Sequence, residues 1–201
     1  MFIILISFLQ GISLFSTPLF AENRKPLKVY YPVGDFILSD SRAKSFSTKQ
    51  LKGKLWVAHI FFSSCEGPCP ATSAHVAHLV DKFSGQLSLH FVSISMDPEH
   101  DTPARLSEYA ASFKVNTSRW HFITGEKNVL ADFLNHGLHI APAKDLMAHS
   151  TSLVLVDSLG RSRGYYSGTS PEDIKRLEDD INFLLEGLKA TATTSKRQVK
   201  K

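Results

Sequence analysis

The run Leu55–Phe62 (LWVAHIFF) constrains the fold of this chain most, because it is apolar almost throughout. A strand with one solvent-exposed face alternates apolar and polar residues, whereas a strand covered on both faces is apolar at nearly every position. Two further runs, Leu87–Met96 and Thr151–Asp157, have the same character. We therefore expect a central sheet that is flanked by helices.

Helical patterns separate the apolar runs. Segment 71–83 repeats apolar residues at helical spacing. Thr102 and Pro103 are typical of a helix start, with Thr as the cap and Pro as the first residue. One more helical pattern ends near Gly137, and Ser170–Asp173 begins the last one. The chain thus alternates strands and helices with crossovers of helix length.

This order resembles a thioredoxin-like core, in which a βαβ unit is followed by a β-hairpin and a C-terminal helix. The closing hairpin is expected from Thr151–Asp157 and Gly164–Tyr166, and an extra N-terminal β-hairpin from Phe36–Leu38 and Ser45–Ser47. The predicted fold class is α/β, a thioredoxin-like fold with a mixed central sheet.

Composition places the chain among globular proteins with one domain. Its 201 residues are 43% hydrophobic and 21% charged. The net charge of +4 is matched by four cationic residues near the C-terminus, so the folded part is close to neutral: Lys196, Arg197, Lys200 and Lys201. We predict a domain over residues 22–190 and a basic disordered tail over residues 191–201. The sequence has no basic stripe with interleaved aromatic residues, which argues against nucleic-acid binding.

Residues 1–21 contain no charged side chain and are largely apolar. Such a segment is typical of a signal peptide or an N-terminal membrane anchor. Gln10 and Pro18 interrupt it and favour cleavage, and Arg24 and Lys25 just beyond it disfavour an anchor with the domain outside. We expect an exported protein in the bacterial periplasm or on the outer face of the inner membrane, with membrane association through the N-terminus as the alternative.

The two cysteines of the chain, Cys65 and Cys69, lie between the first apolar run and the first helix. Residues four apart on a helical turn point the same way, with Cβ atoms roughly 5–6 Å apart. That spacing permits a disulfide after a modest adjustment of the backbone, or the binding of one metal ion by both sulfurs. Pro70 fits the first helical position. Cys69 is therefore expected as the helix N-cap, where the helix dipole favours thiolate.

A purely stabilising disulfide is the plainest alternative for this pair. A bridge that closes so small a loop removes little entropy from the unfolded chain, so stability alone is a poor reason for it. A redox or metal-binding role explains the pair better.

His149 stands out among the nine histidines because it immediately precedes the third apolar run. In the expected topology that strand lies beside the strand that leads to Cys65, so the loop before it faces the cysteines. An imidazole there can complete a Cys₂His set. Two thiolates select Cu(I), imidazole also suits Cu(II), and zinc accepts the same ligands although its structural sites usually have four. His75 and His78 are also spaced for metal binding, but they lack a third ligand and are expected to be solvated.

Several motifs together resemble the SCO/SenC family of exported copper proteins. The Cys-x-x-x-Cys-Pro motif of that family stands here as Cys65–Pro70, and its Asp-Pro-Glu-Arg-Asp-Thr-Pro stretch as Asp97–Pro103. His149 matches its late metal-ligand histidine, and the lead-in Gly34–Leu38 and the turn Leu51–Lys54 also fit. The similarity extends from about Gly34 to Leu188.

The resemblance implies that Cys65, Cys69 and His149 bind one copper ion, as Cu(I) or Cu(II). The expected function is a metallochaperone that serves the copper-site subunit of cytochrome c oxidase, or another copper protein. Two departures from the family pattern stand near the site. Ala148 replaces the aspartate that commonly precedes the histidine, and Glu66–Pro68 between the cysteines is atypical.

Two alternatives to a metallochaperone remain at this point. Cys65 and Cys69 can act as a thiol–disulfide oxidoreductase that keeps the cysteines of a copper-site partner reduced. The same fold can also serve a peroxidase, which needs an accessible thiolate, or a silent scaffold. Whether the chain is an enzyme depends on which of these applies.

Overall fold

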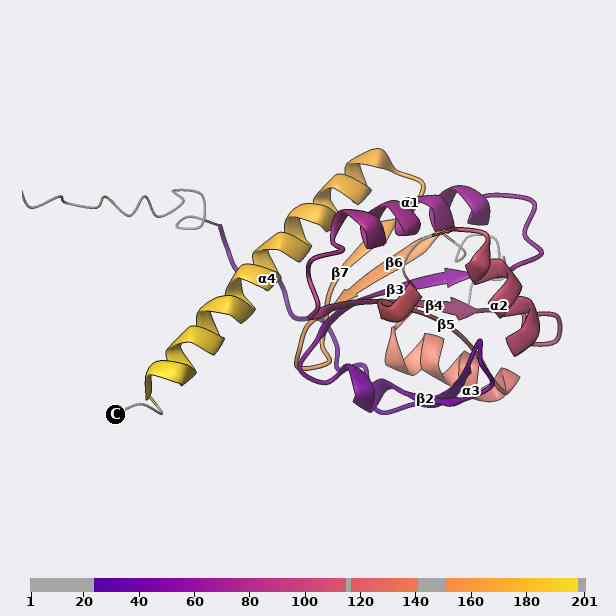
Figure 1. The fold of residues 1–201 in the computed structure, drawn as a ribbon, viewed down its shortest axis with the longest axis horizontal. Coiled ribbons are helices and arrows are strands. Elements are labelled where there is room, and N and C mark those ends of the chain that lie inside the picture. The colour runs from indigo at the N-terminus through magenta and orange to yellow at the C-terminus, as the bar shows by residue number, and fades with distance from the viewer. Residues whose placement is uncertain (1–23, 115–116, 141–150, 199–201) are drawn as a thin grey trace, which may run out of the picture.

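A seven-stranded mixed sheet forms the centre of the computed structural model, which describes residues 24–114, 117–140 and 151–198 (Figure 1). The strand order across the sheet is β2-β1-β5-β4-β3-β6-β7. The strands span β1 (Ile37–Asp40), β2 (Ser45–Ser47), β3 (Leu55–Phe61), β4 (Leu89–Ser95), β5 (Trp120–Thr124), β6 (Ser152–Val156) and β7 (Ser162–Ser167).

Four helices and three short helical turns in the described residues connect the strands. The helices are α1 (Cys69–Lys82), α2 (Pro103–Ala111), α3 (Lys127–Asp132) and α4 (Pro171–Gln198). The turns are η1 (Thr48–Leu51), η2 (Thr117–Arg119) and η3 (Phe133–Gly137). Figure 1 shows α1 on one side of the sheet and α3 on the other.

The sheet separates two hydrophobic cores. The core on the α1 side includes Leu79 of α1, Leu106 of α2 and Ile181 of α4. The core on the opposite side includes Leu130 of α3 together with Phe46. All seven residues of β3 and all seven of β4 are buried, as expected for strands covered on both faces. The predicted α/β class with a mixed sheet and flanking helices is confirmed.

The topology places the ends of β3 and β6 next to each other. β3 is parallel to β4 and antiparallel to β6, and the pairing joins His59 to Leu153. Extending this register by two residues places Thr151 across from Phe61. The chain therefore enters β6 at the edge of the sheet where β3 ends and the cysteine loop begins.

Local sequence signals explain where several elements begin. The Thr102 hydroxyl accepts a hydrogen bond from the Arg105 amide (3.3 Å), and the Ser170 hydroxyl accepts one from the Asp173 amide (3.1 Å). Both are N-cap contacts of the expected kind. The N-terminal hairpin is also present, because β1 pairs with β2. It joins the rest of the sheet through β1 and β5.

Helix α4 continues further than the sequence predicts. It runs to Gln198 and so includes residues 191–198 of the segment 191–201, for which the sequence predicts a disordered tail. Ala, Lys, Arg and Gln in this segment are good helix formers, and the Thr191 hydroxyl donates to the Gly187 and Leu188 carbonyl groups. The predicted signal or anchor segment, residues 1–21, lies outside the described residues. Within the described ranges, no helix has the length and apolar character needed to cross a membrane.

Candidate functional site

The two cysteines lie on the loop from β3 to α1 and in the first turn of that helix. Cys65 is 7% exposed and Cys69 is 1% exposed, and they are not joined in a disulfide. The Cys65 amide donates to the Phe62 carbonyl (3.3 Å), which folds the loop back toward the strand end. The structure therefore holds two buried thiols between β3 and the first turn of α1.

The helix begins one residue earlier than expected. Pro68, not Cys69, is the N-cap, and it makes no side-chain capping bond. Its carbonyl oxygen accepts hydrogen bonds from the amide (3.0 Å) and the hydroxyl (3.1 Å) of Thr72, which closes the first turn. Cys69 consequently lies inside the first turn. It remains near the unpaired amides and the positive end of the helix dipole.

A buried carboxylate joins the cysteine loop to the loop that follows β4. Asp101 is fully buried and accepts hydrogen bonds from the Ser63 amide (3.1 Å to Oδ2), the Ser63 hydroxyl and the Ser95 hydroxyl (2.5 Å). Arg105 of α2 donates its Nε to the same Ser63 hydroxyl (3.2 Å). Ser63 lies two residues before Cys65, so Asp101 fixes the path of the chain into the cysteine loop.

Tyr109 of α2 lies close to both cysteines. Its ring stacks on Phe61 at 5.1 Å, and its hydroxyl is hydrogen-bonded to Ser73 of α1 (2.8 Å). Burial raises the pKa of Tyr109, and the nearby charges of Cys69 and Cys65 raise it further. The phenol is therefore neutral at physiological pH.

A second group of hydrogen-bonded side chains lies in the core on the α1 side of the sheet. The Ser93 hydroxyl accepts from the Trp120 indole (2.8 Å) and is hydrogen-bonded to His59 Nδ1 (2.9 Å). Burial lowers the pKa of His59 to about 3, so the imidazole is neutral. Among described residues, His59 Nε2 is one of two buried side-chain polar atoms without a hydrogen-bond partner. A small hydrogen-bonded polar group therefore lies within the otherwise apolar core on the α1 side of the sheet.

The third predicted ligand, His149, lies outside the described residues, as does Ala148. Thr151 is described, and its place across from Phe61 puts the chain two residues beyond His149 at the same edge of the sheet as the cysteines. Residues 24–114, 117–140 and 151–198 contain no group of three or more His, Cys, Asp or Glu side chains that could hold a metal ion. Any three-ligand metal site that uses this cysteine pair therefore needs a donor from outside these ranges.

The other histidines form no competing site in the described residues. His75 Nδ1 is hydrogen-bonded to the Gly168 carbonyl (2.7 Å), whereas His78 is exposed on α1. His90 and His121 contact each other (3.2 Å), and burial followed by nearby cationic groups lowers the pKa of each to about 4.

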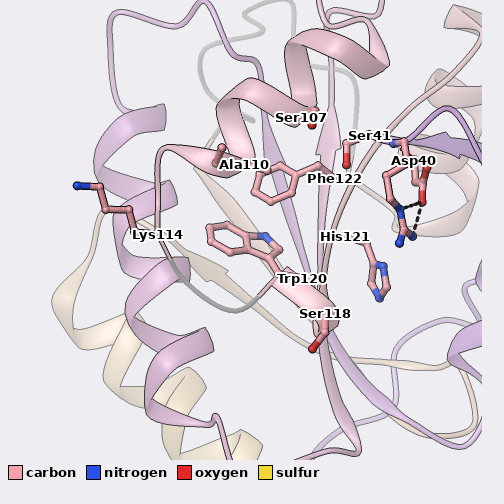
Figure 2. Close-up of a pocket in the computed structure, with 11 residues that line it drawn as sticks. Asp40, Ser41, Ser107, Ala110, Lys114, Ser118, Trp120, His121 and Phe122 are labelled. Carbon is pink, nitrogen blue, oxygen red and sulfur yellow. Dashed lines mark hydrogen bonds and ion pairs between the residues drawn. The ribbon is translucent and has the colours of Figure 1, made fainter.

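A cavity of about 360 Å³ lies between α2 and β5 but contains neither cysteine (Figure 2). Trp120, Phe122 and His121 line it, and Asp40 at its rim is paired with Arg42. This cavity and the cysteine pair are therefore separate features of the described structure.

The sequence identified Cys65 and Cys69 but missed the residues that hold them in place. Asp101, Ser63 and Tyr109 come from three different elements, so their convergence depends on the tertiary fold. The Asp97–Pro103 stretch was the one available signal, because it marked Asp101 without indicating what the carboxylate contacts.

Comparison with known proteins gives consistent matches. A family model described as SCO1/SenC matches residues 26–186. The SCO1 protein homolog of Bacillus subtilis is 30% identical over 157 residues, which is 75% of this chain and 81% of that protein.

Solved structures share the fold. BsSco, described as having a disulfide switch and as a member of the Sco family of cytochrome c oxidase assembly proteins, is 25% identical with a TM-score of 0.70. That match covers 80% of this chain and 98% of BsSco. Bradyrhizobium japonicum ScoI, solved with copper bound, is 25% identical with a TM-score of 0.54, over 73% of this chain and 99% of ScoI.

Proposed function

This chain belongs to the SCO1/SenC family, and from that premise we propose that it carries one copper ion on Cys65, Cys69 and His149. The recipient is the copper-site subunit of cytochrome c oxidase or another copper protein. Copper is cargo in this proposal, so the ligands must hold it and also release it to a partner by ligand exchange.

The buried cysteine pair is the observation that carries the proposal. Two thiols, one on the loop before α1 and one in its first turn, are 7% and 1% exposed, so they supply soft ligands in a site from which water is largely excluded. Such ligands suit Cu(I), as they also suit zinc, and an added imidazole extends the site to Cu(II). The entry of β6 beside Phe61 brings the chain that follows His149 to the same edge of the sheet. Relatives solved with copper support the same assignment.

Copper titration of the reduced protein tests the ligand set. We expect one tight Cu(I) site under anaerobic conditions, lost in the Cys65→Ser, Cys69→Ser double variant. His149→Ala is expected to weaken Cu(II) much more than Cu(I), because two thiolates can hold Cu(I) alone. The visible spectrum of the Cu(II) form should show a strong sulfur-to-copper band.

His78→Ala is the matched control, since His78 is an exposed histidine on the same helix as Cys69. It should leave the affinities for Cu(I) and Cu(II) unchanged. Copper binding that survives loss of both thiols would end the proposal. An equal effect of His149→Ala and His78→Ala would remove His149 from the ligand set.

A thiol–disulfide role is the second candidate. Cys65 and Cys69 are both buried and are not joined in a disulfide, and the related BsSco is described as having a disulfide switch. In this role one thiolate attacks a disulfide of the partner and the other resolves the mixed disulfide, leaving the partner reduced and this pair oxidised. A Cys69→Ser variant should then trap a covalent complex with the partner in cells. A purified protein that retains copper through reduction and dialysis would favour the metallochaperone.

We further propose that residues 1–21 direct export and that the folded domain works in the periplasm or on the outer face of the inner membrane. The apolar, uncharged character of residues 1–21 supports this. Mass measurement of the mature protein checks it, because cleavage after this segment removes about 2 kDa whereas an anchor keeps it.

A further inference from the structure

Three segments of the chain meet at Gly168, which lies between β7 and α4. Its amide donates to the Thr151 carbonyl (2.6 Å), and its own carbonyl accepts from His75 Nδ1 (2.7 Å). A Cβ at this position would overlap Thr72 Cγ2 and would lie 2.9 Å from the Thr151 carbonyl oxygen. Only glycine allows these three segments to approach so closely.

The contacts of Gly168 reach both halves of the proposed copper site. On one side, Thr72 is in the first turn after Cys69, and its hydroxyl donates to the carbonyl of Pro68, between the two cysteines. On the other side, Thr151 is the second residue after His149 and immediately precedes β6, whose register with β3, extended by two residues, points to Phe61. A displacement at Gly168 would therefore change the separation between the cysteine loop and the chain that carries His149.

We propose that Thr72, His75, Thr151 and Gly168, here called the Gly168 bracket, set this separation and thereby position His149 for Cu(II). This inference rests on the proposed function. The bracket residues are positioning residues, because none of them is assigned as a copper ligand. Cu(II) depends on the imidazole whereas Cu(I) can be held by two thiolates, so damage to the bracket should affect Cu(II) selectively.

Gly168→Ala is the direct test. We expect it to weaken Cu(II) binding about tenfold or more, as changes in the groups that orient metal ligands commonly do, and to shift or reduce the sulfur-to-copper band. Cu(I) affinity should stay within about threefold of wild type, because Cys65 and Cys69 are retained. Amide hydrogen exchange of the copper-free protein gives an independent readout, since the amide of residue 168 should lose protection when its bond to Thr151 opens.

A rescue variant separates positioning from general damage. Thr72→Ser removes the Cγ2 methyl that a Cβ at residue 168 would overlap but leaves the 2.9 Å approach to the Thr151 carbonyl, so Thr72→Ser combined with Gly168→Ala should recover part of the Cu(II) affinity. His75→Ala removes one hydrogen bond to Gly168 without adding bulk, so it should weaken Cu(II) binding by a smaller factor. It serves as the test if Gly168→Ala fails to fold. Gly85→Ala is the control, because a Cβ there meets no atom within 4 Å.

The outcomes distinguish this inference from the proposed function. If wild type binds no copper, the proposed function fails and this inference fails with it. If wild type binds copper, but Gly168→Ala and His75→Ala keep the wild-type Cu(II) affinity and spectrum, the inference alone is overturned. Equal losses of Cu(I) and Cu(II), without rescue by Thr72→Ser, would also overturn it.

Discussion

Two buried carboxylates at opposite ends of the sheet are held in different ways. Asp157, in the turn from β6 to β7, is 4% exposed. Its Oδ2 accepts from Arg161 (2.8 Å) and Arg163 (2.9 Å), and its Oδ1 accepts from the amides of Leu159 and Arg161 (both 3.0 Å). Asp101, at the cysteine end, is fully buried and is held by an amide and hydroxyl groups instead.

The difference separates a structural carboxylate from one that can act on the site. At Asp157 two guanidinium groups balance the negative charge, so the cluster is a local structural unit. At Asp101 the direct hydrogen-bond donors are neutral and Arg105 is connected to the carboxylate only through the Ser63 hydroxyl, so the negative charge is less fully balanced. Burial raises the pKa of Tyr109 most, the hydrogen bond to Ser73 lowers it, and Cys69, Cys65 and Asp101 each raise it, so all three act on the same phenol.

Asp157→Asn should have the largest effect on stability. It leaves Arg163, whose side chain is only 10% exposed, without its charged partner. We expect a loss of about 3 kcal/mol in the free energy of unfolding, the cost typical of breaking a buried ion pair. Urea unfolding at pH 7 measures it. Copper binding should be unchanged in the folded variant, and a loss below about 0.5 kcal/mol would show that the cluster behaves like a surface ion pair.

The pH dependence of the unfolding free energy gives a second test of the Asp157 cluster. Burial alone would raise the pKa of Asp157, but hydrogen bonds from Arg161 and Arg163 outweigh it and hold the pKa below its ordinary value of 3.8. The ionised carboxylate therefore contributes stability that is present above pH 3.8 and is lost as the pH falls through the folded-state pKa. The difference in unfolding free energy between wild type and Asp157→Asn should shrink in that range. A difference that stays constant down to pH 2 would contradict the assignment.

Asp101→Asn should cost less stability but should change the site. The amide keeps the shape and one acceptor, and the serine hydroxyl groups can reorient, so we expect a loss of about 1–2 kcal/mol. Removing the negative charge near the cysteines should favour thiolate and speed alkylation of the reduced protein by iodoacetamide at pH 7, by roughly threefold to tenfold.

Asp157→Asn is the matched control for this experiment, because it removes the same charge at the other end of the sheet. Its alkylation rate should equal that of wild type under conditions where both are folded. Equal rates in all three proteins would mean that Asp101 serves only to hold Ser63.

The sequence predicted those parts of the molecule that depend on local patterns. The apolar run at Leu55 forms the central strand, and Thr102 caps α2 as expected. The pairing of β6 with β3 followed from the expected topology alone. This pairing brings the start of β6, next to Thr151, to the edge of the sheet where β3 ends and the cysteine loop begins. The helix cap was misplaced by one residue, because Pro68 and Pro70 both suit a helix start and only the hydrogen bond from Thr72 distinguishes them.

The supporting residues of the site could not be predicted in the same way. Asp101 contacts Ser63 and Ser95 across three different segments, and a charged residue in a polar loop gives no sign that it will be buried. Gly168 is also unremarkable in sequence, since its role depends on how closely Thr72 and Thr151 approach it. Cysteines are recognisable by their chemistry, whereas these residues are recognisable only by their contacts.

Tyr109→Phe should have the smallest effect and tests whether a neutral polar contact at the cysteine end matters. The variant loses the hydrogen bond to Ser73 but keeps the stacking of the ring on Phe61. We therefore expect a loss of about 1 kcal/mol in the free energy of unfolding and no change in alkylation rate at pH 7.

The pKa of Tyr109 is raised in the folded protein, chiefly by burial. The neutral phenol therefore contributes stability at pH values below its ordinary pKa of 10.0, and this stability is lost as the pH rises through the folded-state pKa. The stability difference between wild type and variant should therefore be constant from pH 6 to about 9 and should decrease above pH 10. A faster alkylation in Tyr109→Phe at pH 7 would instead show that the phenol shields the thiols, and the contrast between the two carboxylates would then not account for the reactivity of this end of the sheet.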